Sequence, residues 1–245
     1  MLGLNMLSLL AFIAINLFAT ELCKLSDGSR RRILQRICIV LLSLNLCRYA
    51  LSPLLGNGLK LPVEFSTVSY FVVPIILLTG SKRIQSWAAY SGIMAGFFYY
   101  MTMIIAGGKI YADYPPYDTY ISLCCHGTLY LCGLVSLKTS KYKPSDRYIL
   151  YSGVACIALN AHLFRHIADN GTRLFIYELM DGIYVRQIFP QELMDYTTPV
   201  NIAIIIVFVL LSVSLFFKLN KVQYERHTRA TQKSEPNKTT VKILS

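Results

Sequence analysis

Hydrophobic residues run along most of the chain in long blocks, and polar residues gather in the short connections between the blocks. A helix needs about 20 apolar residues to cross the hydrocarbon core of a membrane. Blocks of this length predict seven membrane-spanning helices, at about residues 4–23, 33–55, 61–80, 84–107, 118–137, 146–168 and 200–217. We therefore expect an all-α, polytopic membrane bundle over residues 1–223, followed by a polar, disordered tail at residues 224–245.

The composition agrees with a membrane protein and excludes a soluble domain with a single anchor. Of the 245 residues, 54% are hydrophobic and only 15% are charged, whereas a soluble domain carries about 25% charged residues. The first block is expected to be a retained span rather than a cleavable signal peptide, because no basic residue precedes it and Asn16 and Glu21 interrupt it.

The net charge of +11 raises the question of a nucleic-acid partner. Eighteen of the 24 lysines and arginines, however, lie in the tail or around the connections after the first, third and fifth spans. Such residues concentrate in cytoplasmic loops, where they face anionic lipid. We therefore predict an external N-terminus, a cytoplasmic C-terminus and an odd number of spans. The expected location is the plasma membrane, with membrane lipids as partners, anionic lipid at the cytoplasmic face and no nucleic acid.

The cysteines do not form a recognisable framework. All seven fall within or at the edge of predicted spans, and no CxxC spacing occurs. We expect neither disulfides nor a metal site, and no cofactor. The external segment at residues 169–199, acidic and aromatic, is expected to lie along the membrane interface or to cap the bundle.

Ionisable residues inside spans are costly, and they mark the candidate site. With the predicted topology, Arg48, Glu64 and His126 fall at similar depth in the outer half of three different spans. The simplest interpretation is that Glu64 neutralises Arg48, either to hold two helices together or as part of a site. The sixth span adds a stripe near its outer end, which is either a solvated face or part of the same site: His162, Arg165, His166 and Asp169.

His126 is the best single candidate for acid–base chemistry. It is the only histidine deep in the fifth span, and a neutral imidazole can be buried and still accept a proton near neutral pH. Its neighbours Cys124 and Cys125 are interpreted as core packing, since apolar surroundings disfavour a reactive thiolate. Asn45 and Asn160 are candidates for hydrogen bonds between helices.

Three stretches carry a resemblance to a known family: "LPVEFSTVSYFVVPIILLTGSKRI", "YSGIMAGFFYYMTMI" and "DYPPYDTYISLCCHGTLYLCGLV". In this order they resemble the YwaF-like integral membrane family, which is related to the eukaryotic transmembrane-protein-164 group. The resemblance covers about residues 35–165. It implies a compact bundle of six or seven helices and, for the eukaryotic group, phospholipid acyl transfer through a membrane cysteine.

The chain departs from the family at the position that matters most for this activity. Aligned on Leu61-Pro62, the family histidine falls on Glu64 and the family cysteine falls on Ser66. The resemblance thus makes Ser66, His126 and Glu64 the candidate catalytic residues. Ser66 would be the nucleophile and His126 its base, because residues 64 and 66 lie about 200° apart on a helix. Four residues would bind the substrate: Arg48, Asn160, His162 and Arg165.

Two functions from different classes remain open at this point. The first is a membrane-embedded phospholipid acyltransferase. The second is a non-catalytic receptor, carrier or assembly protein that binds a small or lipidic ligand, and the replacement of the family cysteine favours it.

Overall fold

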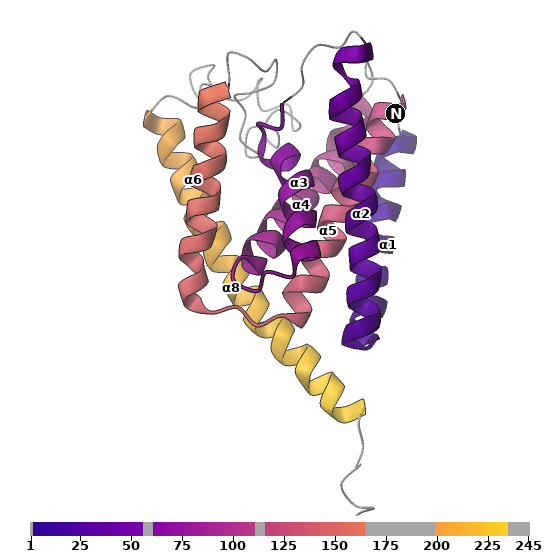
Figure 1. The fold of residues 1–245 in the computed structure, drawn as a ribbon, viewed down its shortest axis with the longest axis vertical. Coiled ribbons are helices and arrows are strands. Elements are labelled where there is room, and N and C mark those ends of the chain that lie inside the picture. The colour runs from indigo at the N-terminus through magenta and orange to yellow at the C-terminus, as the bar shows by residue number, and fades with distance from the viewer. Residues whose placement is uncertain (1, 56–60, 111–115, 165–198, 235–245) are drawn as a thin grey trace, which may run out of the picture.

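The computed structural model describes residues 2–55, 61–110, 116–164 and 199–234 of the chain. Helices dominate this part of the chain, which contains no strand (Figure 1). The helices are α1 Leu2–Lys24, α2 Asp27–Leu51, α3 Phe65–Thr79, α4 Gln85–Ile110, α5 Pro116–Thr139, α6 Arg147–Phe164 and α8 Pro199–Ser234, with short 3₁₀ turns at Pro53–Leu55 and Pro144–Asp146.

Each predicted span corresponds to one helix, so the prediction of an all-helical, multi-pass membrane protein is confirmed. Five of the described helices are long and apolar enough to cross a membrane by length and composition: α1, α2, α4, α5 and α8. α3 is shorter than its predicted span, because it begins only at Phe65, after the cap Glu64, and ends before Gly80, whose φ of 67° terminates the helix. The external segment at residues 169–199 lies almost wholly outside the described residues.

α4 and α5 form the centre of the bundle. More than half of the residues in the apolar stretch of each are buried, against 22% for α1 and 17% for α2. Two glycines in a GxxxG arrangement allow the close contact: a Cβ at Gly92 would lie 2.6 Å from the Leu129 carbonyl oxygen, and one at Gly96 would lie 2.8 Å from that of His126. Small residues at such spacing let membrane helices approach to backbone contact.

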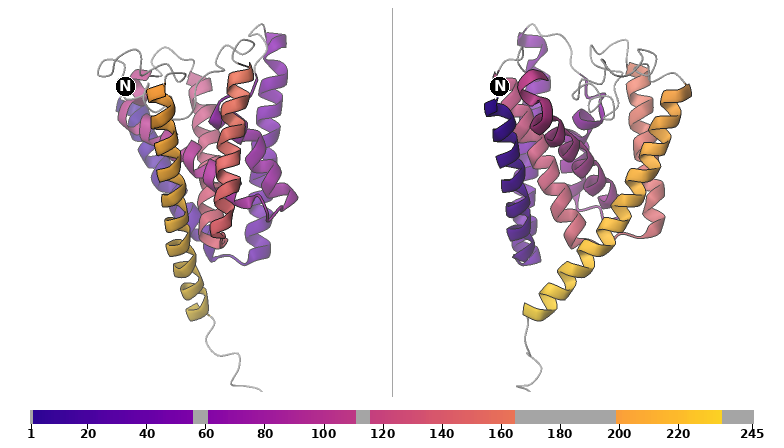
Figure 2. Two further views of the ribbon diagram at one scale, coloured as in Figure 1. Left: turned by 90° about the vertical axis from the view of Figure 1, so that its left-hand side faces the viewer. Right: turned by 180° about the vertical axis from the view of Figure 1, so that it is seen from behind.

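The remaining helices surround this pair. Figures 1 and 2 show α1 and α2 on one side, α6 and α8 on the other, and α3 between them against α4. α8 has 36 residues and is therefore about 54 Å long at 1.5 Å per residue. It crosses the bundle obliquely and continues beyond it (Figure 2). The expectation of disorder from residue 224 is thus wrong for residues 224–234, which continue this helix.

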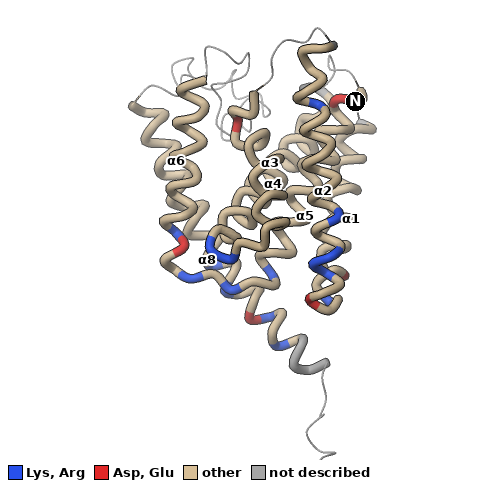
Figure 3. The backbone as a smooth tube through the Cα atoms, viewed as in Figure 1, with Lys and Arg blue, Asp and Glu red and all other residues tan. Residues whose placement is uncertain are grey.

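Lysines and arginines of the described residues gather at one end of the bundle (Figure 3). This is the end where α1 meets α2, α3 meets α4, α5 meets α6, and α8 emerges; α1 begins at the opposite end. We call it the basic end. The gathering of lysines and arginines at one end is the pattern from which the topology was predicted. Which side of the membrane the basic end faces stays a prediction.

Candidate functional site

His126 lies in the interior of the bundle, where α3, α4 and α5 meet. Its side chain is buried, with 6% of the residue exposed. The ring stacks on Tyr99 of α4, with centroids 3.7 Å apart and planes 5° from parallel, and it meets Tyr70 of α3 edge-on at 5.3 Å. Two aromatic rings from two helices therefore fix the plane of the imidazole.

Hydrogen bonds also fix its tautomer. Nδ1 lies 2.8 Å from the Ser122 carbonyl oxygen one turn earlier on α5. A carbonyl only accepts hydrogen bonds, so Nδ1 carries the proton and donates. Nε2 is then the basic nitrogen. The Tyr70 hydroxyl lies 2.9 Å from Nδ1 and 3.2 Å from Nε2, so it is within hydrogen-bond distance of both ring nitrogens. His126 thus contacts α3 through the Tyr70 hydroxyl.

The face of α3 that meets His126 is polar. Buried residues recur at Ser66, Ser69, Tyr70 and Val73, the spacing of one side of a helix. Ser66 is 4% exposed and precedes Tyr70 by one turn, so both side chains lie on the same side of α3. Ser69 donates to the Phe65 carbonyl of its own helix at 2.7 Å. The candidate nucleophile and the tyrosine bound to His126 therefore share one face.

The predicted Arg48–Glu64 ion pair is wrong, because both groups have other partners. Arg48 of α2 pairs with Asp118 in the first turn of α5, at 3.1 Å. Glu64 is the N-cap of α3: its side chain accepts from the Thr67 backbone N–H, and its own N–H donates to the Thr67 hydroxyl at 3.0 Å. A carboxylate is favourable at a helix N-terminus because unpaired N–H groups and the positive end of the helix dipole lie there. This explains an acidic residue at the start of an apolar segment.

A second contact joins α2 to α5 one turn deeper. Asn45 is fully buried and donates to the Leu41 carbonyl at 2.9 Å and to the Cys125 sulfur at 3.6 Å. Cys125 is 1% exposed. All seven cysteines are free thiols. Asn45 thus connects two helices, as expected from the sequence, and Cys125 packs in the core.

The residues predicted on the sixth span do not join this group in the described structure. Asn160 of α6 donates to the Pro62 carbonyl ahead of α3, at 3.1 Å. His162 is exposed on the outside of the bundle, and Arg165 lies outside the described residues. Of the predicted substrate-binding residues, Arg48 is the one that contacts α5, the helix of His126.

Three residues of this region were missed by the sequence reasoning: Tyr70, Tyr99 and Asp118. Tyr70 carried a usable signal, since it follows Ser66 by four residues in a helix. Asp118 carried another, because the N-terminal end of the fifth span lies at the depth of Arg48 when the two spans run in opposite directions. Tyr99 gave none, since "FFYY" presents aromatic residues on every side of its helix.

Comparisons with known proteins give one result. No curated protein and no solved structure matches the chain. The model of the TMEM164 family matches residues 1–220, which extends beyond both ends of the region where the resemblance was recognised and confirms it. The chain therefore belongs to the TMEM164 family.

Proposed function

We propose that this protein is a membrane-embedded acyltransferase acting on phospholipids, with Ser66 as the acyl acceptor and His126 as the base. The observation that carries the proposal is the orientation of His126. The Ser122 carbonyl accepts the Nδ1 proton, and the Tyr70 hydroxyl, on the face of α3 that bears Ser66, lies 2.9 Å from Nδ1 and 3.2 Å from Nε2. A base oriented by a third group is the usual way to activate a hydroxyl nucleophile.

The chemistry is an exchange of esters. The Ser66 hydroxyl attacks the acyl carbonyl of a phospholipid, and its proton passes through the Tyr70 hydroxyl to His126 Nε2. The bond from the acyl carbon to the glycerol oxygen breaks, and that oxygen takes the proton and leaves as a lysophospholipid. The hydroxyl of a second lysophospholipid then attacks the acyl-serine by the same steps in reverse, which regenerates Ser66.

The burial of both residues favours transfer over hydrolysis. Ser66 and His126 are 4% and 6% exposed, and a site that excludes water protects an acyl intermediate until the lipid acceptor arrives. Arg48 is proposed as the group that attracts the phosphate. It is 27% exposed and is held by Asp118, so it lies between the interior and the membrane surface. Glu64 supports the site through the cap that fixes the start of α3.

The test uses purified protein in phosphatidylcholine nanodiscs with labelled lysophosphatidylcholine as the acceptor. We expect Ser66→Ala and His126→Ala each to lower the rate of label transfer by about a thousandfold, because they remove the nucleophile and the base. Tyr70→Phe should lower it by about tenfold. Ser69→Ala is the matched control, since it removes a buried hydroxyl of α3 that binds its own backbone, and it should keep the parental rate. Equal rates in all four variants would reject the assignment.

A second function is favoured by the same region. His126 has hydrogen-bond partners at both nitrogens and a stacked ring, which is the environment of a histidine that only supports the fold. In this alternative the protein is a non-catalytic receptor, carrier or assembly protein. It would form no product in the assay above, yet lysophosphatidylcholine would raise its melting temperature, because a ligand bound only by the folded state stabilises it.

A further inference from the structure

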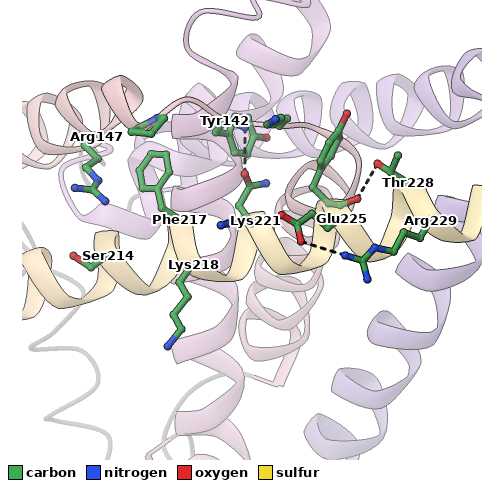
Figure 4. Close-up of a pocket in the computed structure, with 13 residues that line it drawn as sticks. Tyr142, Arg147, Ser214, Phe217, Lys218, Lys221, Glu225, Thr228 and Arg229 are labelled. Carbon is green, nitrogen blue, oxygen red and sulfur yellow. Dashed lines mark hydrogen bonds and ion pairs between the residues drawn. The ribbon is translucent and has the colours of Figure 1, made fainter.

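A cleft at the basic end is lined by residues that follow Ser66 and His126 in the sequence. It opens between the α5–α6 connection and the C-terminal half of α8 (Figure 4). Its volume is about 580 Å³. Ligand pockets in proteins have about 300–1,000 Å³. The cleft is therefore large enough for a polar group of the size of a lipid headgroup.

Its lining is strongly cationic. Five basic residues and one acidic residue contribute to it: Lys141, Arg147, Lys218, Lys221, Arg229 and Glu225. The acidic residue is already engaged, since Glu225 pairs with Arg229 at 3.9 Å (Figure 4). All five basic side chains are exposed, so they are hydrated and accessible to a ligand at the surface. The positive charge exceeds what one phosphodiester would neutralise.

A rigid support holds these groups in place. Asn220 of α8 is 2% exposed and donates to the carbonyls of Leu137 and Ser140 at 2.8 Å each. Its amide oxygen accepts from the Tyr142 N–H at 3.2 Å (Figure 4). Tyr142 stacks on Phe216 and donates its hydroxyl to the Ser136 carbonyl; burial raises the pKa of Tyr142, so that donor stays protonated. α8 is thereby fixed to the α5–α6 connection.

The same side of α8 is apolar toward the middle of the bundle. Leu211 and Leu215 precede Lys218 by seven and three residues, which places them on its side of the helix. They are 66% and 55% exposed, so they face lipid in a membrane. At the cleft itself, the Arg147 guanidinium lies over the Phe217 ring, 5.6 Å from its centroid. A ligand with a charged head and apolar chains matches a cationic cleft that adjoins an apolar helix surface.

We infer that the cleft binds the headgroup of an anionic phospholipid carrying more than one phosphate charge, with its acyl chains against Leu211 and Leu215. Lys218 and Lys221 contact the phosphates, and Arg147, braced on Phe217, closes the other side. Basic pockets between membrane helices are a known mode of binding for phosphoinositide-type headgroups. The site is separate from Ser66 and His126, so it stands whether or not the protein transfers acyl groups.

The test measures binding of fluorescent short-chain phosphatidylinositol bisphosphate to the full chain in phosphatidylcholine nanodiscs. We expect Lys218→Gln/Lys221→Gln to weaken binding by about tenfold or more, since each cation near an anionic headgroup contributes about 1 kcal/mol and 1.4 kcal/mol is tenfold. Lys82→Gln/Arg83→Gln is the matched control. It removes the same number of exposed charges from the α3–α4 turn at the same end, and binding should change by about twofold at most.

Two further arms make the result decisive. Lys218→Arg/Lys221→Arg keeps the charges and should keep the binding, which separates loss of charge from loss of folding. Free inositol trisphosphate should compete at least about tenfold more weakly than the lipid, because it lacks the acyl chains. Equal weakening by the cleft and control variants would overturn the site. If free inositol trisphosphate bound with the same affinity as the lipid, the cleft would be a site for soluble polyanions, and the proposal of a lipid ligand would be rejected.

Discussion

The region around His126 and the cleft at the basic end differ in almost every physical property. The first is buried and contains neutral hydroxyl and imidazole groups whose hydrogen bonds and stacking fix their orientation. The second is open, strongly cationic and lined by exposed side chains on a fixed backbone. Reactions that need orientation and exclusion of water suit the first environment. Recognition of a charged headgroup by exposed, hydrated cations suits the second.

The two regions also depend on different kinds of packing. The α4–α5 contact beside His126 relies on the absence of side chains at Gly92 and Gly96, so it fails when volume is added. The cleft depends on Asn220, a polar residue with backbone partners, so it fails when hydrogen bonds are removed. Substitutions can therefore disturb one region while leaving the other intact.

The largest expected effect is that of Gly96→Ala. The new methyl group would collide with the backbone of Tyr130 and with the His126 carbonyl, which cannot move without separating the helices. We expect a loss of about 2–3 kcal/mol in the free energy of unfolding, measured by reversible unfolding in mixed micelles. Gly107→Ala in the same helix is the control: the atoms nearest to its Cβ would belong to the flexible side chain of Met103, at 3.3 Å or more. An equal loss in both variants would contradict the proposed role of the GxxxG contact.

Asn220→Leu should have the next largest effect on the free energy of unfolding, and it should affect the cleft at the basic end. Three backbone groups lose their partner, each worth about 1 kcal/mol or more when buried, so we expect a loss of about 2–3 kcal/mol. Lipid binding at the cleft should fall, whereas the stacking of Tyr99 on His126 should be unchanged. Asn160→Leu removes one backbone bond by the same substitution and should cost about 1 kcal/mol. Hydrogen exchange of α8 in the two variants measures the difference; a similar effect would show that α8 is not held by Asn220.

The smallest effect is expected for the Arg48–Asp118 pair. Its side chains are 27% and 31% exposed, so solvent and salt screen the attraction. A double-mutant cycle with Arg48→Gln and Asp118→Asn should give a coupling of about 0.5–1 kcal/mol. The pair Lys24–Glu21, with both side chains 65% exposed, should give a coupling near zero. A coupling no larger than in this control would mean that the pair does not join α2 to α5.

Much of the fold was predictable from the sequence, and the predictions that were wrong have identifiable reasons. The positions of the seven helices follow from hydropathy, which is a property of each segment alone. The end of α8 was missed because its polar residues suggested a disordered tail, whereas Asn220 and the i,i+4 pair Glu225–Arg229 support further helical turns. α3 was predicted too long because hydropathy does not register a capping residue such as Glu64.

The site was predicted less well than the fold. His126 and Ser66 were recognised as candidates and both are buried, but the expected partner of Arg48 was wrong. Depth in the membrane can be counted from the sequence, and it placed Arg48, Glu64 and His126 at a similar level. Depth does not say which way a side chain points around its helix axis. Tyr70 and Tyr99 escaped notice for the same reason, and so did the exposure of His162.

The sequence by itself determined that the chain is a helical membrane protein of this family with its positive charge at one end, because hydropathy, charge placement and short motifs are local properties. Only the tertiary structure decided which polar groups meet. The rotation and tilt of each helix are set by contacts between distant segments, such as Gly96 against His126 and Asn220 against the α5–α6 connection. These contacts bring Tyr70 to His126 and Asp118 to Arg48, and they form the basic cleft.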